Sequence, residues 1–361
     1  MYFDKIEQTT RISPIFISII FFLKKFLIDI DLVRFVLMNI ILLNQLVFFY
    51  CLKNSKIKEY FDDKTLFLIS SSIYLSPSFR ANSIWPESAM LGLLFFLLST
   101  YFYLKFKKNL KLKFVFLNIF FLSIASYIRP SFCLFAIFFS IEYLLTFYKQ
   151  RYFYKKLLLI FFSNLFLAFP AIYYVFVLDI FFISYGGLSN NYFNKFSIIS
   201  SIIMFHLIPI LYIFKNEFKL KDKINIIILF LSILSLIVIF FKFDYNLDFA
   251  GGGIILHLSQ FVFKNKIIFF IFYLFSVFFL LRVSFFKNFK NSIIYLTLIL
   301  ITPQYHIFHK YYDPLVIILF LTIFEVNLKN IEKNKKFISI SILSFYISLY
   351  TLHFVNNNFI S

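Results

Sequence analysis

Apolar runs of about 15 to 20 residues recur along the whole chain, and each ends in a short polar break. The run AMLGLLFFLLSTYFYL, followed by KFKKNLKLK, is typical of them. A segment inside hydrocarbon must satisfy its own backbone hydrogen bonds, and a helix of this length does so. The composition agrees, because a chain that is 61% hydrophobic has too little polar surface to cover a soluble core. The pattern predicts an all-α polytopic membrane protein, with residues 1–361 forming a single integral membrane domain.

The apolar runs predict about twelve transmembrane helices, which together form a bundle over 36–355. The predicted spans are 36–52, 65–78, 89–104, 114–128, 131–148, 157–178, 197–214, 224–241, 267–282, 292–302, 314–326 and 338–355.

Alternate breaks between the runs are rich in lysine and arginine, and together they hold 24 of the 36 basic residues. These breaks lie at 53–64, 105–113, 149–156, 215–223, 282–290 and 327–336. Basic residues collect in the cytoplasmic loops of membrane proteins. The remaining loops are therefore predicted to face outward, at 1–35, 76–88, 129–130, 179–196, 242–266 and 303–313. The pattern therefore indicates a multi-pass protein of the cell inner (plasma) membrane.

Residues 1–35 are predicted to form an outer loop that carries an interfacial helix. The segment 12–28 is apolar for only about a dozen residues before Lys24 and Lys25, which is too short for a span. A helix in the plane of the interface, with its lysine side chains reaching water, fits this segment. The alternative is a thirteenth span, which would place the N-terminus inside.

Several classes of function have no support in the sequence. The net charge of +19 does not indicate a nucleic-acid partner, because no basic soluble domain carries it. Cys51 and Cys133 both lie in apolar runs and form neither a disulfide framework nor a metal-binding spacing. Nucleotide-binding and zinc-protease motifs do not occur. We therefore predict no cofactor, and the need for a divalent metal stays open.

One carboxylate, Glu142, lies within the predicted span 131–148. It has two interpretations of equal weight: a functional intramembrane carboxylate, or a partner for a lysine at the cytoplasmic end of the helix.

Four polar clusters lie in the predicted outer loops, at 79–87, 127–130, 244–253 and 304–314. Guanidinium, ammonium and imidazole groups at an outer membrane surface suit the phosphate of a lipid headgroup. The residues predicted to bind a donor phosphate are Arg80, Arg129, His309 and Lys310. Aromatic and carboxylate groups beside them suit a sugar and its hydroxyls. The residues predicted to bind substrate are Asn82, Trp85, Glu87, Tyr305, His306, Tyr311 and Asp313.

Each cluster also has a plainer interpretation. Arg80 and Arg129 could be interfacial anchors, and the glycines at 251–253 could form only a turn. The cluster at 304–314 exceeds what anchoring needs. A metal bound by His306 and His309 would have two ligands on one helical face and no third ligand specified, so no metal site is predicted.

The run 11–56 resembles the second-helix region of the C-type glycosyltransferases, which use polyprenyl-phosphate sugars. In that superfamily a basic residue and a proline open a juxtamembrane helix, and an arginine leads into the next one. Arg11, Pro14 and Arg34 stand in those places. The run FRANSIWPE is similar to a motif of the dolichyl-phosphate-glucose α-1,2-glucosyltransferase branch, which Arg80, Asn82 and Trp85 match in part. The resemblance covers about the first 130 residues.

The resemblance implies a catalytic carboxylate in the first outer loop, after an initial transmembrane helix. The chain is expected to begin within that loop, either because its start is truncated or with Asp4 and Glu7 as the remnant of the loop's acidic pair. Asp4 is the candidate for that proton acceptor. The function expected is transfer of a sugar from a polyprenyl-phosphate-linked donor to a lipid-linked glycan or other acceptor at the outer face. The partners implied are that donor, that acceptor and membrane lipids.

Two other functions compete with this one. A polysaccharide repeat-unit polymerase of the O-antigen type shares the helix count and the arginine-bearing outer loops, but usually carries one large outer loop. A flippase or transporter should have broken or charged helices at mid-membrane and a repeat between its halves, and neither is clear here.

Overall fold

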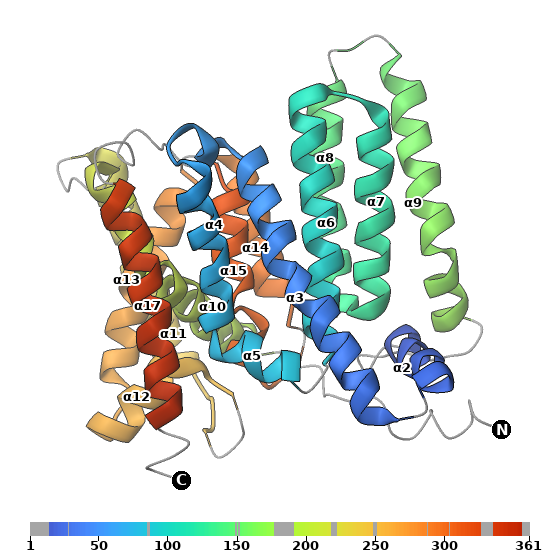
Figure 1. The fold of residues 1–361 in the computed structure, drawn as a ribbon. Helices are drawn as coiled ribbons and strands as arrows, with labels where there is room; N and C mark the ends of the chain where they lie inside the picture. Colours follow the sequence, from blue (N-terminus) through green and yellow to red (C-terminus); the bar gives the residue numbers. More distant parts are fainter. Residues whose placement is uncertain are drawn as a thin grey trace. The chain divides into compact units, whose positions relative to one another are not determined.

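A computed structural model describes residues 14–355 apart from 28, 85–86, 149, 151, 177–190, 218–221, 248–250, 287, 303 and 326–334. Every regular element among these residues is a helix (Figure 1). Internal contacts divide the chain into two compact units. Unit 1 comprises Met1–Ser55 and Ala81–Leu188, and unit 2 comprises Lys56–Arg80 and Ser189–Ser361. The assignment of residues 1–361 to one integral membrane domain stays a prediction.

The helices of unit 1 follow the predicted apolar runs. They are α2 (Pro14–Leu27), α3 (Ile30–Asn54), α6 (Ser88–Asn109), α7 (Leu112–Ile128), the 3₁₀ helix η3 (Pro130–Leu134), α8 (Phe135–Phe147) and α9 (Phe153–Phe176). Helix α6 lies between α3 and α7 and packs extensively against both (Figure 1).

Helices α6 and α7 are joined by a buried polar pair. The Asn118 side-chain amide donates 2.7 Å to Ser99 Oγ and 2.9 Å to the Ser99 carbonyl. The Ser99 hydroxyl lies 3.1 Å from the Asn118 carbonyl, and both side chains are fully buried. Hydrogen bonds of this kind between apolar helices fix their rotation, since the alternative is an unsatisfied polar group.

Helix α2 covers the predicted interfacial segment 12–28. Its Phe16 is buried against Leu91, Leu94 and Ile128, whereas Phe22 on the same helix is exposed. The helix therefore packs on unit 1 by one face. Its position in a membrane interface stays a prediction.

The contacts of Glu142 favour one of the two interpretations that the sequence left open for this residue. Its carboxylate is 1% exposed, accepts a hydrogen bond of 2.7 Å from the Tyr103 hydroxyl and lies 3.0 Å from Lys107 Nζ. Lys107 belongs to the last turn of α6, at the lysine-rich end. The glutamate therefore pairs with a lysine from a predicted cytoplasmic break.

Unit 2 contains the remaining helices. They are η1 (Lys56–Glu59), α4 (Asp63–Ser71), η2 (Ser72–Leu75), α10 (Tyr192–Leu207), η5 (Ile208–Glu217), α11 (Lys223–Lys242), α12 (Gly253–Phe263), α13 (Ile267–Val283), α14 (Phe289–Leu300), η6 (His309–Tyr311), α15 (Leu315–Thr322) and α17 (Lys335–Val355). Helix α5 (Pro77–Ile84) runs across the boundary between the two units. Within unit 2, α10 contacts α11, α12, α13, α14 and α15.

The predicted span 65–78 corresponds to α4 and η2, which together cover 63–75, and the chain leaves the helical conformation at Ser76. Pro77 disfavours a helical conformation at Ser76, which is extended with ψ 122°. Before it, the hydroxyls of Ser71 and Ser72 donate to the carbonyls of Phe67 and Ile69, which competes with a regular helix. The break frees the Ser76 side chain for contacts outside its own helix.

Two boundaries differ from the sequence predictions. The predicted outer loop 242–266 contains α12, an apolar helix of 11 residues that is too short to span a membrane alone. Gly252 and Gly253 precede and open it with φ of 92° and 78°, which other residues rarely adopt. The predicted span 314–326 corresponds to the eight-residue helix α15.

Seven helical stretches in the described part of the chain are long and apolar enough to cross a membrane. They are Ile30–Asn54, Ser88–Asn109, Pro130–Phe147, Phe153–Tyr173, Tyr192–Phe214, Lys223–Lys242 and Lys335–Phe354. In the stretch Phe153–Tyr173, only 6% of the apolar segment is buried within the protein. Such exposed apolar helices are typical of a membrane protein. The count of twelve spans stays a prediction.

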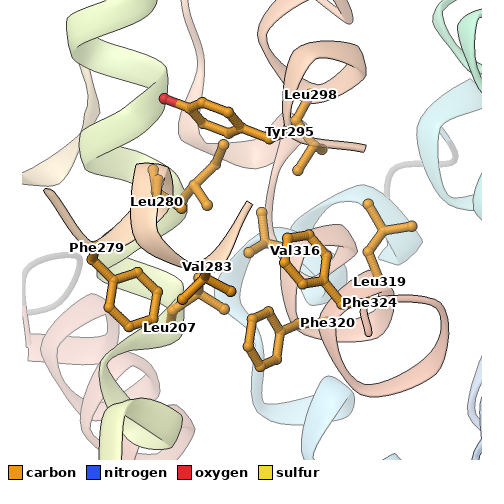
Figure 2. Close-up of a pocket in the computed structure, with 11 residues that line it drawn as sticks. Leu207, Phe279, Leu280, Val283, Tyr295, Leu298, Val316, Leu319, Phe320 and Phe324 are labelled. Carbon is orange, nitrogen blue, oxygen red and sulfur yellow. The ribbon is translucent and has the colours of Figure 1, made fainter. Parts of the chain in front are cut away.

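A small apolar hollow lies within unit 2, between α10, α13, α14 and α15 (Figure 2). Phe279, Phe320 and Phe324 contribute rings to its wall. The Tyr295 hydroxyl pairs with Ser200 Oγ at 2.7 Å. None of the predicted site residues lines this hollow.

Candidate functional site

The buried carboxylate of Asp313 is the centre of a polar network in unit 2. Asp313 is 2% exposed and precedes α15, and Ser76 Oγ donates to its Oδ2 at 2.6 Å. The Tyr346 hydroxyl of α17 lies 3.4 Å from the other carboxylate oxygen. Ser76 Oγ also accepts a hydrogen bond of 3.0 Å from the Phe79 backbone and so caps the start of α5. One serine thus ties the end of a predicted outer loop to the break between η2 and α5.

The charge state of Asp313 is set by opposing effects. Burial raises the pKa of Asp313, whereas His309 and hydrogen bonds from Ser76, Ser78 and Tyr346 lower it. Burial is the larger effect, so the net pKa of this carboxyl lies above its ordinary value.

Arg80, a predicted phosphate ligand, lies over an aromatic ring of the same unit. Its guanidinium carbon is 4.5 Å from the centre of the Tyr350 ring, which gives a cation–π contact. Ser76 and Arg80 are four residues apart, as are Tyr346 and Tyr350 on α17. Residues four apart share a helical face, so one face of α17 contacts both Asp313 and Arg80. Arg80 remains exposed.

The glycine-rich cluster and the late outer cluster meet in the structure. The Gly252 backbone donates 2.9 Å to the Ile307 carbonyl, and the Tyr245 and Tyr305 rings are stacked, 5.5 Å apart with planes at 9°. A Cβ atom on Gly251 would come within 2.7 Å of the Tyr245 hydroxyl and 3.0 Å of the Ile307 carbonyl. The glycine therefore permits this close approach, which sequence reasoning had not connected to the tyrosines.

The other predicted residues of the late cluster lie around Phe308. The Tyr311 ring packs edge-on against Phe308 at 5.5 Å, the His306 ring lies 6.1 Å away, and Lys310 Nζ lies 5.7 Å from the same ring. All are partly exposed. The described residues contain no group of three histidine, cysteine or acidic side chains that could hold a metal.

His309 does not join the residues around Phe308, because its ring lies against His206 of α10. Its ring centre lies 4.5 Å from that of His206, which is fully buried. Burial lowers the pKa of His309 well below its usual range, His206 lowers it further, and Asp313 raises it in part. The imidazole is therefore neutral at pH 7, which makes His309 a poor counter-charge for a phosphate.

Three predicted site residues belong to unit 1. Asn82 is buried, and its carbonyl accepts a hydrogen bond of 3.3 Å from the backbone of Glu87, the residue that precedes α6. Arg129 follows α7, and its Nε donates to Ser131 Oγ at 3.1 Å. A Cβ atom on Gly92 would come 3.1 Å from Arg129 Cβ, so the backbone of α6 passes close to this turn. The role of Arg129 as a ligand of the donor phosphate stays a prediction.

Two predicted residues, Asp4 and Trp85, lie outside the described residues. Sequence reasoning missed three that the network uses: Ser76, His206 and Tyr346. His206 had a usable signal, because an ionisable side chain inside an apolar run is a functional candidate by default. Ser76 and Tyr346 had no such signal in the sequence, because serine and tyrosine are frequent throughout this chain.

Comparison with known proteins adds no assignment: no family model, curated protein or solved structure matches this chain.

Proposed function

We propose that the chain is a membrane glycosyltransferase, which transfers a sugar from a polyprenyl-phosphate-linked donor to a lipid-linked glycan or another acceptor. The observation that supports the proposal is the convergence of three segments in unit 2. The 76–80 segment brings an exposed arginine, the 304–313 segment brings tyrosines and a lysine, and α17 holds both through Tyr346 and Tyr350. A cation beside aromatic rings suits a phosphate attached to a sugar.

In this proposal Arg80 neutralises the departing polyprenyl phosphate, with Lys310 as a second cation. A guanidinium forms two parallel hydrogen bonds with phosphate oxygens, and its interaction strengthens as negative charge develops on the leaving group. The bond from sugar C1 to the phosphate oxygen breaks while a bond to the acceptor oxygen forms. The leaving phosphate takes the electron pair, and a carboxylate accepts the acceptor's proton.

Asp313 does not suit the role of that proton acceptor. It is 2% exposed and its carboxylate already accepts a hydrogen bond from Ser76. We assign it a positioning role, in which it holds the 304–313 segment against α5 and α17. The proton acceptor proposed from the family resemblance, Asp4, is retained as the candidate.

The site is proposed to face outward, at the inner membrane of the cell. The support is the distribution of basic residues along the chain: Lys107 and Lys108 lie in the last turn of α6 and Lys223 opens α11, and both positions fall in breaks that are rich in lysine. The segments 76–80, 243–253 and 304–313 alternate with those breaks along the chain.

Release of polyprenyl phosphate from a synthetic polyprenyl-phosphate hexose tests the proposal directly. Purified protein in detergent would be incubated with a panel of such donors and a mixed lipid-linked acceptor. We expect addition of one sugar per acceptor. Formation of long products from a lipid-pyrophosphate repeat unit would instead identify a polymerase, and no turnover of any donor would contradict the proposal.

A further inference from the structure

Partly or fully exposed lysines gather at one end of unit 1. At this end α6 turns into α7, and α8 is followed by α9 (Figure 1). Contacts join the two places, because Lys107 in the last turn of α6 pairs with Glu142 of α8. Lys108 Nζ also lies 3.4 Å from the carbonyl of Lys53, in the last turn of α3. The following residues are called the lysine rim: Lys105, Lys108, Lys111, Lys113, Lys155 and Lys156.

Little acidic charge balances the lysine rim. Of the carboxylates that the structure describes in unit 1, Asp29, Asp31 and Glu87 lie at the beginnings of α3 and α6, whereas the rim is at the helix ends. The remaining one, Glu142, has a side chain that is 1% exposed and is already paired with Lys107. The described part of the rim therefore carries positive charge that the described carboxylates do not neutralise.

The basic residues of unit 2 are arranged differently, because carboxylates lie beside some of them. Arg282 lies 3.1 Å from Asp222, and Lys290 lies 3.4 Å from Glu325. Paired charges of this kind attract a further anion weakly, since the field of each cation is largely cancelled by its partner. An external anion is therefore attracted to the lysine rim more than to these pairs.

The lysine side chains of the rim lie along the apolar surface of the helices. Three ammonium groups are close to aromatic rings: Lys105, Lys113 and Lys156 lie 5.4, 5.2 and 4.9 Å from the ring centres of Tyr101, Phe114 and Phe147. A long side chain that covers apolar surface and presents its charge at the edge is typical of a membrane interface. The positive charge thus stays at the border of the apolar helices instead of extending away from it.

Exposed tyrosines accompany the lysine rim. Tyr148, Tyr152 and Tyr154, between the end of α8 and the start of α9, are 67%, 63% and 77% exposed. Tyrosine is enriched where a membrane meets water, because its ring is apolar and its hydroxyl group is polar. The apolar helix α9 continues from them with little burial in the protein. Cations, tyrosines and an exposed apolar helix in this order fit an amphiphile with an anionic head better than a soluble acidic protein.

We propose that the lysine rim binds the phosphate headgroups of anionic phospholipids. Clusters of about four to eight basic residues beside membrane helices attract such lipids through the sum of their charges, whereas a zwitterionic headgroup has no net charge to attract. The inference goes beyond the proposed sugar transfer and does not depend on it, because Arg80 belongs to unit 2.

The first test uses the unmodified protein in a neutral detergent and measures its thermal midpoint in mixed micelles. A ligand that binds the folded state raises the midpoint, so we expect phosphatidylglycerol to raise it by about 2–4 °C more than phosphatidylcholine with the same acyl chains. The difference should disappear when the ionic strength rises from about 0.05 to about 0.5 M, because salt screens surface charges. Equal midpoints in the two lipids would overturn the inference. An equal rise with inorganic phosphate, which has the charge without the lipid, would overturn it too.

The second test separates the lysine rim from the overall positive charge. The test variant replaces three lysines of the rim: Lys108→Gln, Lys111→Gln and Lys113→Gln. The matched control replaces three exposed lysines of unit 2: Lys223→Gln, Lys335→Gln and Lys336→Gln. The rim variant should lose about half or more of the phosphatidylglycerol effect, with an unchanged midpoint in phosphatidylcholine, whereas the control should keep most of the effect. Equal losses in the two variants would show a response to net charge alone and overturn the inference.

Discussion

Ser76 Oγ donates a hydrogen bond of 2.6 Å to Asp313, although the two residues are 237 positions apart in the chain. The same hydroxyl oxygen caps α5 by accepting from the Phe79 backbone. One buried side chain therefore controls both the position of a predicted outer segment and the start of the helix that carries Arg80.

The Ser76→Ala variant should lose about 1–3 kcal/mol of stability, because it leaves a buried carboxylate with one donor fewer and removes a helix cap. The thermal midpoint of the protein in detergent measures this. Ser163→Ala is the matched control, since Ser163 Oγ donates only within its own helix, to the Leu159 carbonyl at 2.7 Å. Equal midpoints for the two variants would show that the Ser76–Asp313 contact contributes little.

Much of the helical framework could be predicted from the sequence, because long apolar runs form helices whatever surrounds them. The end of the helix near Ser76 agrees with the predicted outer loop 76–88, but the hydroxyl contacts of Ser71 and Ser72 before it could not be predicted, because hydroxyl groups compete with the backbone without changing the apolar pattern. Helix α12 was missed because 11 residues are too few for a span and the glycine triplet suggested a loop.

The site was harder to predict than the helices. Its residues come from positions 76–80, 206, 304–313 and 346–350, and no local pattern indicates that these converge. Arg80 and the late cluster were found from residue types that are rare in apolar surroundings. The burial of Asp313 and the pairing of His309 with His206 depend on packing between distant helices, which composition does not reveal.

Stability should fall on mild acidification because of His309. Burial lowers its pKa, so the folded protein favours the neutral ring. This contribution to stability is present above about pH 6.5, the unfolded value, and is lost as pH falls toward the lowered folded pKa. Between pH 7.5 and 5.5 the loss is about 1.4 kcal/mol for one histidine. The thermal midpoint of His309→Gln should therefore fall less than that of the unmodified protein over this range. Parallel falls would contradict the assignment.

Lys107 should matter more than its neighbours in the lysine-rich end of α6. It pairs with Glu142, which is 1% exposed, so Lys107→Gln leaves a buried carboxylate without its cation. We expect a loss of about 1–3 kcal/mol, measured by thermal unfolding in detergent. Lys111→Gln, at an exposed position, should change stability little. Adding Glu142→Gln to Lys107→Gln should restore part of the loss; no restoration would argue against the pairing.

The orientation of the chain can be tested with reporter fusions. An enzyme that is active only in the cytoplasm should be active when fused after Lys108 or Lys156, and silent when fused after Pro86 or Asn191. Lys108 lies in the last turn of α6 and Asn191 directly precedes α10, so neither fusion cuts a helix in its middle. Equal activity at the two sets of positions would overturn the orientation and the outward-facing site.

The most direct test of the proposed function is sugar transfer by Arg80→Lys, normalised to folded protein in detergent. Lysine keeps the charge but loses the paired hydrogen bonds that a guanidinium makes to phosphate. If Arg80 neutralises the leaving phosphate, the activation free energy should rise by about 2–4 kcal/mol, a loss of roughly 30- to 1000-fold in turnover. Tyr350→Leu, which removes only the ring beneath the guanidinium, is the control for the cation–π contact and should cost less. Turnover of Arg80→Lys close to that of the unmodified protein would contradict the account and leave Arg80 as an interfacial anchor held by Tyr350.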